Sequence, residues 1–188
     1  MVLDPSPADL PKLRAAPNLK VVDGAENRTI FFGMDQFRDE LPGGNVKGKN
    51  PLKDVRVRKA LYQAIDVQTL SRVTMRGLSQ PTGALIAPQV NGWSRKADVR
   101  WPYDVVAARK QLADAGYPNG FEVTLDCPNN RYVNDERICQ ALAAMWSQVG
   151  VATKVNAMPR ANYFPKLEKT DTSLYMLGWG GASTDGIF

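Results

Sequence analysis

Residues 121–157 read FEVTLDCPNNRYVNDERICQALAAMWSQVGVATKVNA, and their pattern predicts a strand, a helix and a second strand. Apolar and polar residues alternate over 121–126, which predicts a strand with one buried face. Apolar residues then recur at helical spacing from Asp135 until Gly150, where the helix is expected to stop, and residues 151–157 alternate again. A strand, a helix and a strand within so short a stretch predict a parallel β-α-β unit with a right-handed connection.

The sequence on both sides of this unit extends it into a larger sheet. The run SLYMLGW at 173–179 is apolar on both faces and predicts a central strand that is covered from both sides. Two shorter strands are predicted at 19–23 and 28–34, with Asp23 and Gly24 as turn residues between them.

Helical patterns alternate with these strands, and polar, glycine- and proline-bearing stretches at 39–51 and 79–103 predict loops. The helices are predicted at 54–65, 67–77, 104–116 and 162–170. The predicted fold class is therefore α/β, with a mixed β-sheet flanked by helices in a single domain.

The chain has 188 residues, which suits one domain of ordinary size. It contains no run of about eighteen apolar residues, the length that a membrane-spanning helix needs. The opening MVLDPSPADLP has neither a basic start nor an apolar core. We therefore expect no membrane span and no signal peptide within this sequence.

Basic residues outnumber acidic ones by 24 to 19, which gives a net charge of +5. The densest basic patch comprises Lys47, Lys49, Lys53, Arg56, Arg58 and Lys59. A nucleic-acid-binding module could use the patch from Lys47 to Lys59 for phosphate contacts, and this is the alternative function. No aromatic residue interleaves the patch, and its helical part has an apolar opposite face. A solvated helix face is therefore favoured, and we expect no nucleic-acid partner.

Histidine is absent, which removes the commonest general base and the commonest metal ligand. The segment GASTDG at 181–186 resembles a nucleophile elbow only in part and has no histidine partner. The glycines at 178–181 also miss the dinucleotide fingerprint, because Ser183 stands where a third glycine is needed. The sequence predicts no enzyme activity, no cofactor and no metal site.

Several segments resemble one protein family, in the same order along the chain. NPLKDVRVRKALYQAID (50–66) resembles the helix signature of extracellular solute-binding proteins of family 5, the peptide-, oligopeptide- and nickel-binding proteins that serve ABC transporters. YDVVAARKQLADAGYPNGFEVTL (103–125) is similar to the helix-turn-strand segment of that family. The opening DPSPADLPKLRAAPNLKVV (4–22), and the spacing from ICQALAAMWSQVGVATKV (138–155) to LGWGG (177–181), also follow the family pattern.

The resemblance implies both a fold and a function. Family members are longer, with two lobes that close over a ligand, and residues 1–188 are similar to the second lobe alone, in the type II arrangement of periplasmic binding proteins. It follows from the resemblance that a first lobe belongs to the same parent protein and that this parent is periplasmic. The parent is expected to bind peptides or other small solutes without catalysis and to deliver them to ABC permease membrane subunits.

Cys127 and Cys139 are the only two cysteines. One lies at the end of a predicted strand and the other in the first turn of the following helix. In the oxidising compartment that the resemblance implies, a disulfide is the favoured interpretation. Closing that short loop contributes about 3 kcal/mol on the chain-entropy model. The alternative is a pair of buried free thiols.

The loop 128–134, between these cysteines, carries Asn130, Arg131 and Tyr132. Ligands of open α/β sheets lie beyond the carboxyl ends of parallel strands, so this loop and the loop 180–186 are predicted to line one rim. Arg131 can grip a carboxylate with two hydrogen bonds, and peptide-binding relatives are similar in placing an arginine here. The alternative is an ordinary solvent-facing arginine. Tyr132 adds a ring and a hydroxyl group, and Asn130 adds a donor and an acceptor.

At the second loop the sequence departs from the peptide-binding pattern. After the Gly-Trp motif, here Gly178 and Trp179, peptide-binding members usually carry an aspartate that takes the ligand's amino group. This sequence has Ala182 and Ser183 there, with Asp185 slightly later. Either Asp185 acts from a shifted position or the ligand has no α-amine. Trp179 and Ser183 are also candidate ligand contacts, although a tryptophan at a strand end is more often a core residue.

Overall fold

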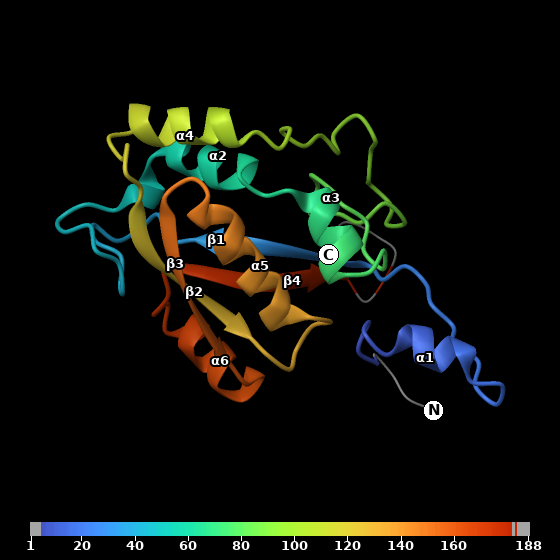
Figure 1. Ribbon diagram of the computed structural model, residues 1–188. Helices are drawn as coiled ribbons and strands as arrows, with labels where there is room; N and C mark the ends of the chain where they lie inside the picture. Colours follow the sequence, from blue (N-terminus) through green and yellow to red (C-terminus); the bar gives the residue numbers. More distant parts are fainter. Residues whose placement is uncertain (1–4, 182, 184–188) are drawn as a thin grey trace.

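The computed structural model describes residues 5–181 and 183. Four strands form one sheet: Arg28–Met34 (β1), Phe121–Pro128 (β2), Val151–Met158 (β3) and Leu174–Gly180 (β4). Their order across the sheet is β1-β4-β2-β3 (Figure 1). β2 runs parallel to β3 and to β4, whereas β1 runs antiparallel to β4. The predicted mixed sheet and the inner position of its last strand are confirmed.

The helical segments are Leu10–Ala15 (α1), Pro51–Lys53 (η1), Val55–Gln63 (α2), Val67–Thr69 (α3), Leu70–Thr74 (η2), Val105–Asp114 (α4), Asp135–Ser147 (α5) and Arg160–Glu168 (α6). Helices α2, α4 and α5 lie over one face of the sheet and α6 over the other (Figure 1). Successive side chains of a strand point to opposite faces. In β2, Leu125 shares the core with α2, α4 and α5, and its neighbour Asp126 meets α6.

Aspartate side chains begin three of the helical segments. Asp54 accepts a hydrogen bond from the backbone N–H of Arg56 at 2.8 Å, and Asp104 accepts one from that of Ala107 at 2.8 Å. Asp66 does the same for α3. Each bond satisfies a backbone donor that the helix itself leaves unpaired, so the predicted starts at Asp54 and Asp104 are confirmed.

The main core lies between the sheet and the helices α2, α4 and α5. Trp146 of α5 is fully buried there, and its indole Nε1 donates a hydrogen bond to the carbonyl oxygen of Leu61 at 2.9 Å. Leu112 of α4 and Leu174 of β4 are buried in the same cluster. This packing holds the β-α-β unit as one body, so the edge of its sheet is a fixed platform.

The predicted strand at 19–23 is wrong. These residues are not part of any strand, and Val22 is 80% exposed. Leu19, Val21 and Val22 are residue types suited to a sheet. A strand also needs a neighbour to bond with, and none pairs with this segment among the described residues. The predicted strand at 28–34 is confirmed as β1.

The predicted helix at 67–77 is only partly formed. A single turn, α3, passes directly into the wider turn η2, in which the N–H of Met75 donates to the carbonyl oxygen of Leu70 five residues earlier at 3.0 Å. Several residues of this stretch are β-branched or serine, which are weak helix formers.

Asp126 departs from the predicted pattern of β2, in which it belonged to the polar and solvent-facing set. Its side chain is only 1% exposed, because α6 covers this end of the strand. One carboxylate oxygen accepts from Lys166 Nζ at 2.9 Å and the other from Asn156 Nδ2 at 2.6 Å. The buried charge is thus both paired and hydrogen-bonded, as burial requires.

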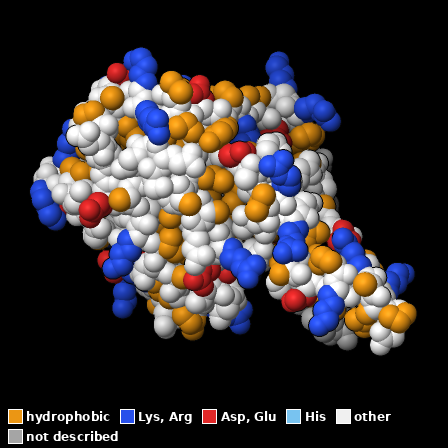
Figure 2. All heavy atoms as spheres, in the orientation of Figure 1, with side chains coloured by type: hydrophobic (Ala, Val, Ile, Leu, Met, Phe, Trp, Pro, Cys, Tyr) orange, Lys and Arg blue, Asp and Glu red, His pale blue; other side chains and the backbone are white. Residues whose placement is uncertain are grey.

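The segment before β1 stands apart from the rest. α1 and the residues that follow it project from the body of the protein in both general views (Figures 1 and 2). Arg14 and Asp23 form an exposed ion pair at 3.1 Å within this segment. Among the described residues, no helix is both long enough and apolar enough to cross a membrane.

Candidate functional site

Three parallel strands end at the same edge of the sheet. The loop 128–134 leaves β2 there, α6 begins just after β3, and residues 180–181 leave β4. Because β1 is antiparallel to β4, its first residue, Arg28, pairs with Gly180 at that edge. We call residues 25–28, 128–134 and 178–181 together the rim.

Tyr132 joins two parts of the rim. Its hydroxyl oxygen accepts a hydrogen bond from the backbone N–H of Gly178 at 2.9 Å. A side chain at position 178 would collide with the Tyr132 ring, since a Cβ atom built there would lie 2.8 Å from Cε1 of that ring. Glycine at 178 is therefore what allows the loop 128–134 to lie against β4.

Two arginines lie against the Tyr132 ring. The guanidinium carbon of Arg131 is 4.8 Å from the ring centroid, and that of Arg28 is 5.7 Å from it. Arg28 also pairs with Glu26 at 2.9 Å. Arg131 has no carboxylate within 4.0 Å among the residues that the structure describes. The ring thus places an uncompensated guanidinium at the strand ends.

Asp135 holds the backbone of the loop 128–134. Its carboxylate accepts from the N–H groups of Arg131 at 2.8 Å and Tyr132 at 3.0 Å, and also from that of Glu136 at 2.9 Å. Asp135 is the first residue of α5. Its bond to Glu136 lies within the first turn of that helix, and its other two bonds fix the loop, so this residue orients Arg131 and Tyr132.

Covalent and polar links fasten the loop on both sides. Cys127 and Cys139 are joined by a disulfide, with their Cα atoms 6.7 Å apart. Asn134 adopts a left-handed conformation, with φ of 56°, and its side-chain amide donates to the carbonyl oxygen of Thr74 at 2.8 Å. The second link ties the rim to η2, a contact that no local pattern in the sequence predicts.

Asn130 has a structural partner. It is exposed, and its amide oxygen accepts from the backbone N–H of Arg160 at 2.8 Å, which caps the first turn of α6. This bond occupies the amide oxygen, which the sequence indicated as a hydrogen-bond acceptor for a ligand. Its amide nitrogen has no such bond within the described part of the chain.

The remaining predicted site residues lie around the end of β4. Trp179 is 60% exposed and stands at the rim. Because side chains alternate along a strand, it points to the face opposite the one on which Tyr132 covers Gly178. Ser183 is exposed, two positions after Gly181. Asp185 lies outside the described residues.

A hollow of about 330 Å³ opens at the rim beside these residues. It is lined by Ala25, Glu26, Asn27, Arg28, Gly180 and Gly181. Sequence reasoning missed Glu26 and Arg28, because only the antiparallel register of β1 and β4 brings them to the same edge as the loop 128–134. The sequence places Glu26 just before a predicted strand and Arg28 at its first position, but it does not show which strand pairs with it.

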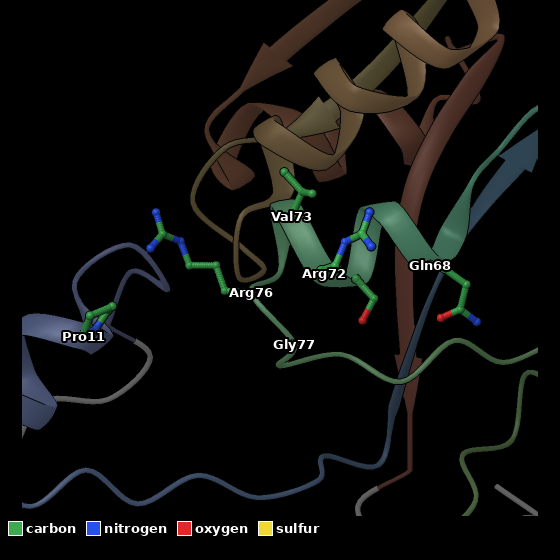
Figure 3. A pocket seen from close by; sticks show the side chains of 7 residues that line it. Pro11, Gln68, Arg72, Val73, Arg76 and Gly77 are labelled. Carbon is green, nitrogen blue, oxygen red and sulfur yellow. The ribbon is translucent and has the colours of Figure 1, made fainter.

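A larger hollow of about 650 Å³ lies between α1 and the segment formed by α3 and η2 (Figure 3). Pro11 from α1 and Gln68 from α3 mark its two ends, with Arg72 and Arg76 between them. One wall belongs to the projecting N-terminal segment. The loop 128–134 contributes no lining residue to it.

The basic patch from Lys47 to Lys59 is largely engaged within the protein. Three of its cations form ion pairs, in the pairs Lys47–Glu40, Lys53–Asp39 and Arg56–Asp54. The hydrogen bond from Lys47 holds the pKa of Glu40 below its usual value, and that from Lys53 does the same for the pKa of Asp39. The other three donate to carbonyl oxygens or lie over rings: Arg58 to Leu52 and Lys53, Lys49 on Tyr117, Lys59 on Trp101.

The distribution of charge also counts against a phosphate-binding surface. Lys and Arg side chains are scattered around the face shown in Figure 2 and are not gathered over one element. A nucleic-acid interface gathers its cations on one surface, where they neutralise successive phosphates. The scattered and locally partnered cations give the alternative function no structural support.

Comparison with known proteins identifies the family. A profile described as "Bacterial extracellular solute-binding proteins, family 5 Middle" matches residues 1–188. The chain belongs to this family.

Two curated relatives show how family 5 proteins compare with this chain. Heme-binding protein A of Haemophilus influenzae is 26% identical over 189 residues, which cover 98% of this chain and 32% of that protein. Glutathione-binding protein GsiB of Escherichia coli K12 is 30% identical over 144 residues, which cover 74% of this chain and 27% of that protein. The family 5 chain described here therefore spans a third or less of the length of these relatives.

Solved structures show the same fold. The periplasmic binding protein DppA from Helicobacter pylori, in complex with the peptide STSA, superposes with a TM-score of 0.83 at 21% identity, over 96% of this chain and 32% of that one. A dipeptide-binding protein from Pseudoalteromonas sp. SM9913, in complex with Met-Leu, superposes with a TM-score of 0.81 at 18% identity. The match covers 98% of this chain and 34% of that one. The four-stranded mixed sheet with its flanking helices is thus a fold shared with parts of periplasmic binding proteins.

Proposed function

We propose that residues 1–188 form one lobe of a solute receptor that serves an ABC transporter, and that the rim contacts the cargo. The cargo is a peptide or a related small solute, which is bound without chemical change. A first lobe, outside this chain, supplies the other side of the cleft. The parent protein acts in the periplasm and delivers its cargo to the membrane permease subunits of the transporter.

Family membership supports the general class of this proposal, because the family consists of extracellular solute-binding proteins. The names of similar proteins refer to peptides, glutathione and heme. Such a range supports a small-solute cargo for this chain and favours no single compound.

One observation carries the proposal: the hydrogen bond between Tyr132 and Gly178, with Arg131 packed on the same ring. It brings two loops from different strands into one surface at the carboxyl edge of the sheet, where open α/β folds bind ligands. The guanidinium of Arg131 lies against the ring, and the backbone N–H of Arg131 is held by Asp135. Such a preordered group loses little freedom when it binds a carboxylate with two hydrogen bonds.

The test is an Arg131→Ala substitution in the full-length parent protein. Candidate cargoes are recovered from the natively purified protein and identified by mass spectrometry, then titrated by calorimetry. We expect Arg131→Ala to weaken the affinity about 10- to 100-fold, since hydrogen bonds between charged groups contribute about 1.5–3 kcal/mol. Ligand-induced thermal stabilisation should shrink in parallel.

The matched control is Arg137→Ala, which removes an exposed arginine from α5 outside the rim. It changes the net charge by the same amount and should leave the affinity within about twofold, because exposed charges away from the ligand contribute little. Undiminished affinity in Arg131→Ala, or equal losses in both variants, would remove Arg131 from the binding site.

A further inference from the structure

The hollow at the rim contains both members of an ion pair. Arg28 and Glu26 meet at 2.9 Å, with side chains 29% and 63% exposed. Both line the hollow of about 330 Å³, next to Gly180 and Gly181. Neither residue belongs to the binding loop that the sequence indicated, yet Arg28 and Arg131 lie against the same tyrosine ring.

Arg28 is the fixed member of this pair. Its backbone is the first residue of β1 and pairs with Gly180. Its Cδ lies so close to Gly178 that a Cβ atom built there would be 2.8 Å away, and its guanidinium lies over the Tyr132 ring. The stem and the head of the side chain are therefore both held, so the guanidinium is positioned before any ligand arrives.

Glu26 is the replaceable member. It precedes β1 in a segment outside regular structure, and most of its side chain is exposed. Exposed ion pairs contribute about 0–1 kcal/mol, so a second carboxylate that enters the hollow can displace this one at little cost. Beside the rim, the carboxylate of Asp135 is occupied by backbone N–H groups. Among the described residues, Glu26 is therefore the acid that pairs with a rim arginine, Arg28.

We propose that this hollow is a second anion subsite, in which Arg28 binds a carboxylate of the ligand and Glu26 is the internal competitor that occupies it beforehand. Together with Arg131, the rim then recognises two negative groups. The favoured ligand class is a peptide or other small solute that carries two carboxylates. This inference rests on the proposed function and adds the charge of the cargo to it.

The opposite assignment makes Glu26 the recognition group, for a ligand ammonium, with Arg28 as its support. The two assignments predict opposite changes in ligand affinity for the substitution Glu26→Gln. Glu26→Gln removes a competing negative charge in the first case and should strengthen the binding of a diacid. In the second case it removes the group that binds the ligand and should weaken binding.

The experiment uses the full-length parent protein and two tripeptides, Ala-Ala-Glu and Ala-Ala-Gln, which differ by one carboxylate. Titration calorimetry gives the ratio of their dissociation constants. For the wild-type protein we expect Ala-Ala-Glu to bind about tenfold more tightly, and for Glu26→Gln the ratio should increase further. Arg28→Gln should bring the ratio close to one, and the control Arg137→Gln should keep the wild-type ratio. Circular dichroism and unfolding midpoints show whether each variant is folded.

The outcomes separate this inference from the proposed function. If the wild-type protein binds both tripeptides equally and Arg131→Ala weakens both, the peptide receptor stands and the second subsite is rejected. Weaker binding of Ala-Ala-Glu in Glu26→Gln also rejects it, in favour of ammonium recognition. If neither tripeptide binds the wild-type protein, the peptide cargo and the subsite are both rejected.

Discussion

Tyr132 organises the rim at the level of single residues. Its hydroxyl group accepts a hydrogen bond from Gly178 of β4, and its ring contacts two arginines. Its backbone N–H donates to the carboxylate of Asp135. A large aromatic side chain can meet so many partners because one ring presents a polar tip and two faces. The arrangement also requires an empty position beneath the ring, which Gly178 provides.

Gly178→Ala tests that requirement. The added methyl group would lie 2.8 Å from atoms of Arg28, Ile30 and Tyr132, so at least one of these side chains must move. We expect a loss of about 1–3 kcal/mol in the free energy of unfolding, measured by urea denaturation, as for other overpacked sites. The control is Gly24→Ala, where an added Cβ meets nothing within 4 Å. Equal stability of the two variants would contradict the packing described here.

At the level of elements, the loop 128–134 and the bonds around it connect β2, α5, α6 and η2. The disulfide joins β2 to α5, Asn130 caps α6, and Asn134 bonds η2. A loop tied at several points loses less conformational entropy on binding than a free one. The loop is thus expected to serve as a rigid part of the cleft, with movement left to whole lobes.

Replacing both Cys127 and Cys139 by alanine tests the contribution of the disulfide. The bridge closes a loop of 12 residues' separation. The chain-entropy model gives about 3 kcal/mol for such a bridge, so we expect a comparable decrease in the free energy of unfolding. Urea denaturation of the wild-type protein with and without reductant provides the independent measurement. No decrease in either experiment would favour buried free thiols, the alternative that the sequence left open.

At the level of the whole molecule, stability is distributed unevenly. The sheet and the helices α2, α4 and α5 enclose one core, whereas residues 20–27 have no backbone N–H bonded to another backbone group in the described structure. Local opening is easiest where few contacts must break. The rim includes residues of both kinds, since Glu26 lies in the segment 20–27, which has few backbone hydrogen bonds, and Arg28 lies in the sheet.

Native-state hydrogen exchange followed by mass spectrometry measures this gradient. We expect peptides that cover 20–27 to exchange within the earliest time points, because their amides are not bonded. Peptides from β4, which has a strand on each side, should exchange last, with protection approaching the global free energy of unfolding. Strong protection of 20–27 in this chain would mean that the segment pairs with a strand after all.

The sequence by itself determined the order and type of most elements. Alternation in β2, helical spacing in α5 and the aspartates before α2 and α4 are local signals, and each reports which face of a segment is buried or how a helix begins. The predicted location of Arg131 and Tyr132 at a strand end follows from the same local order.

Only the tertiary structure decided which strands pair and which charges meet. The antiparallel register of β1 against β4 joins residues about 150 positions apart and brings Arg28 beside Tyr132, while α6 buries Asp126. The segment 19–23 has a strand-like pattern but no partner. Periodicity along the chain records how a residue faces its surroundings, but pairing depends on the packing energy of the whole fold, which no local pattern contains.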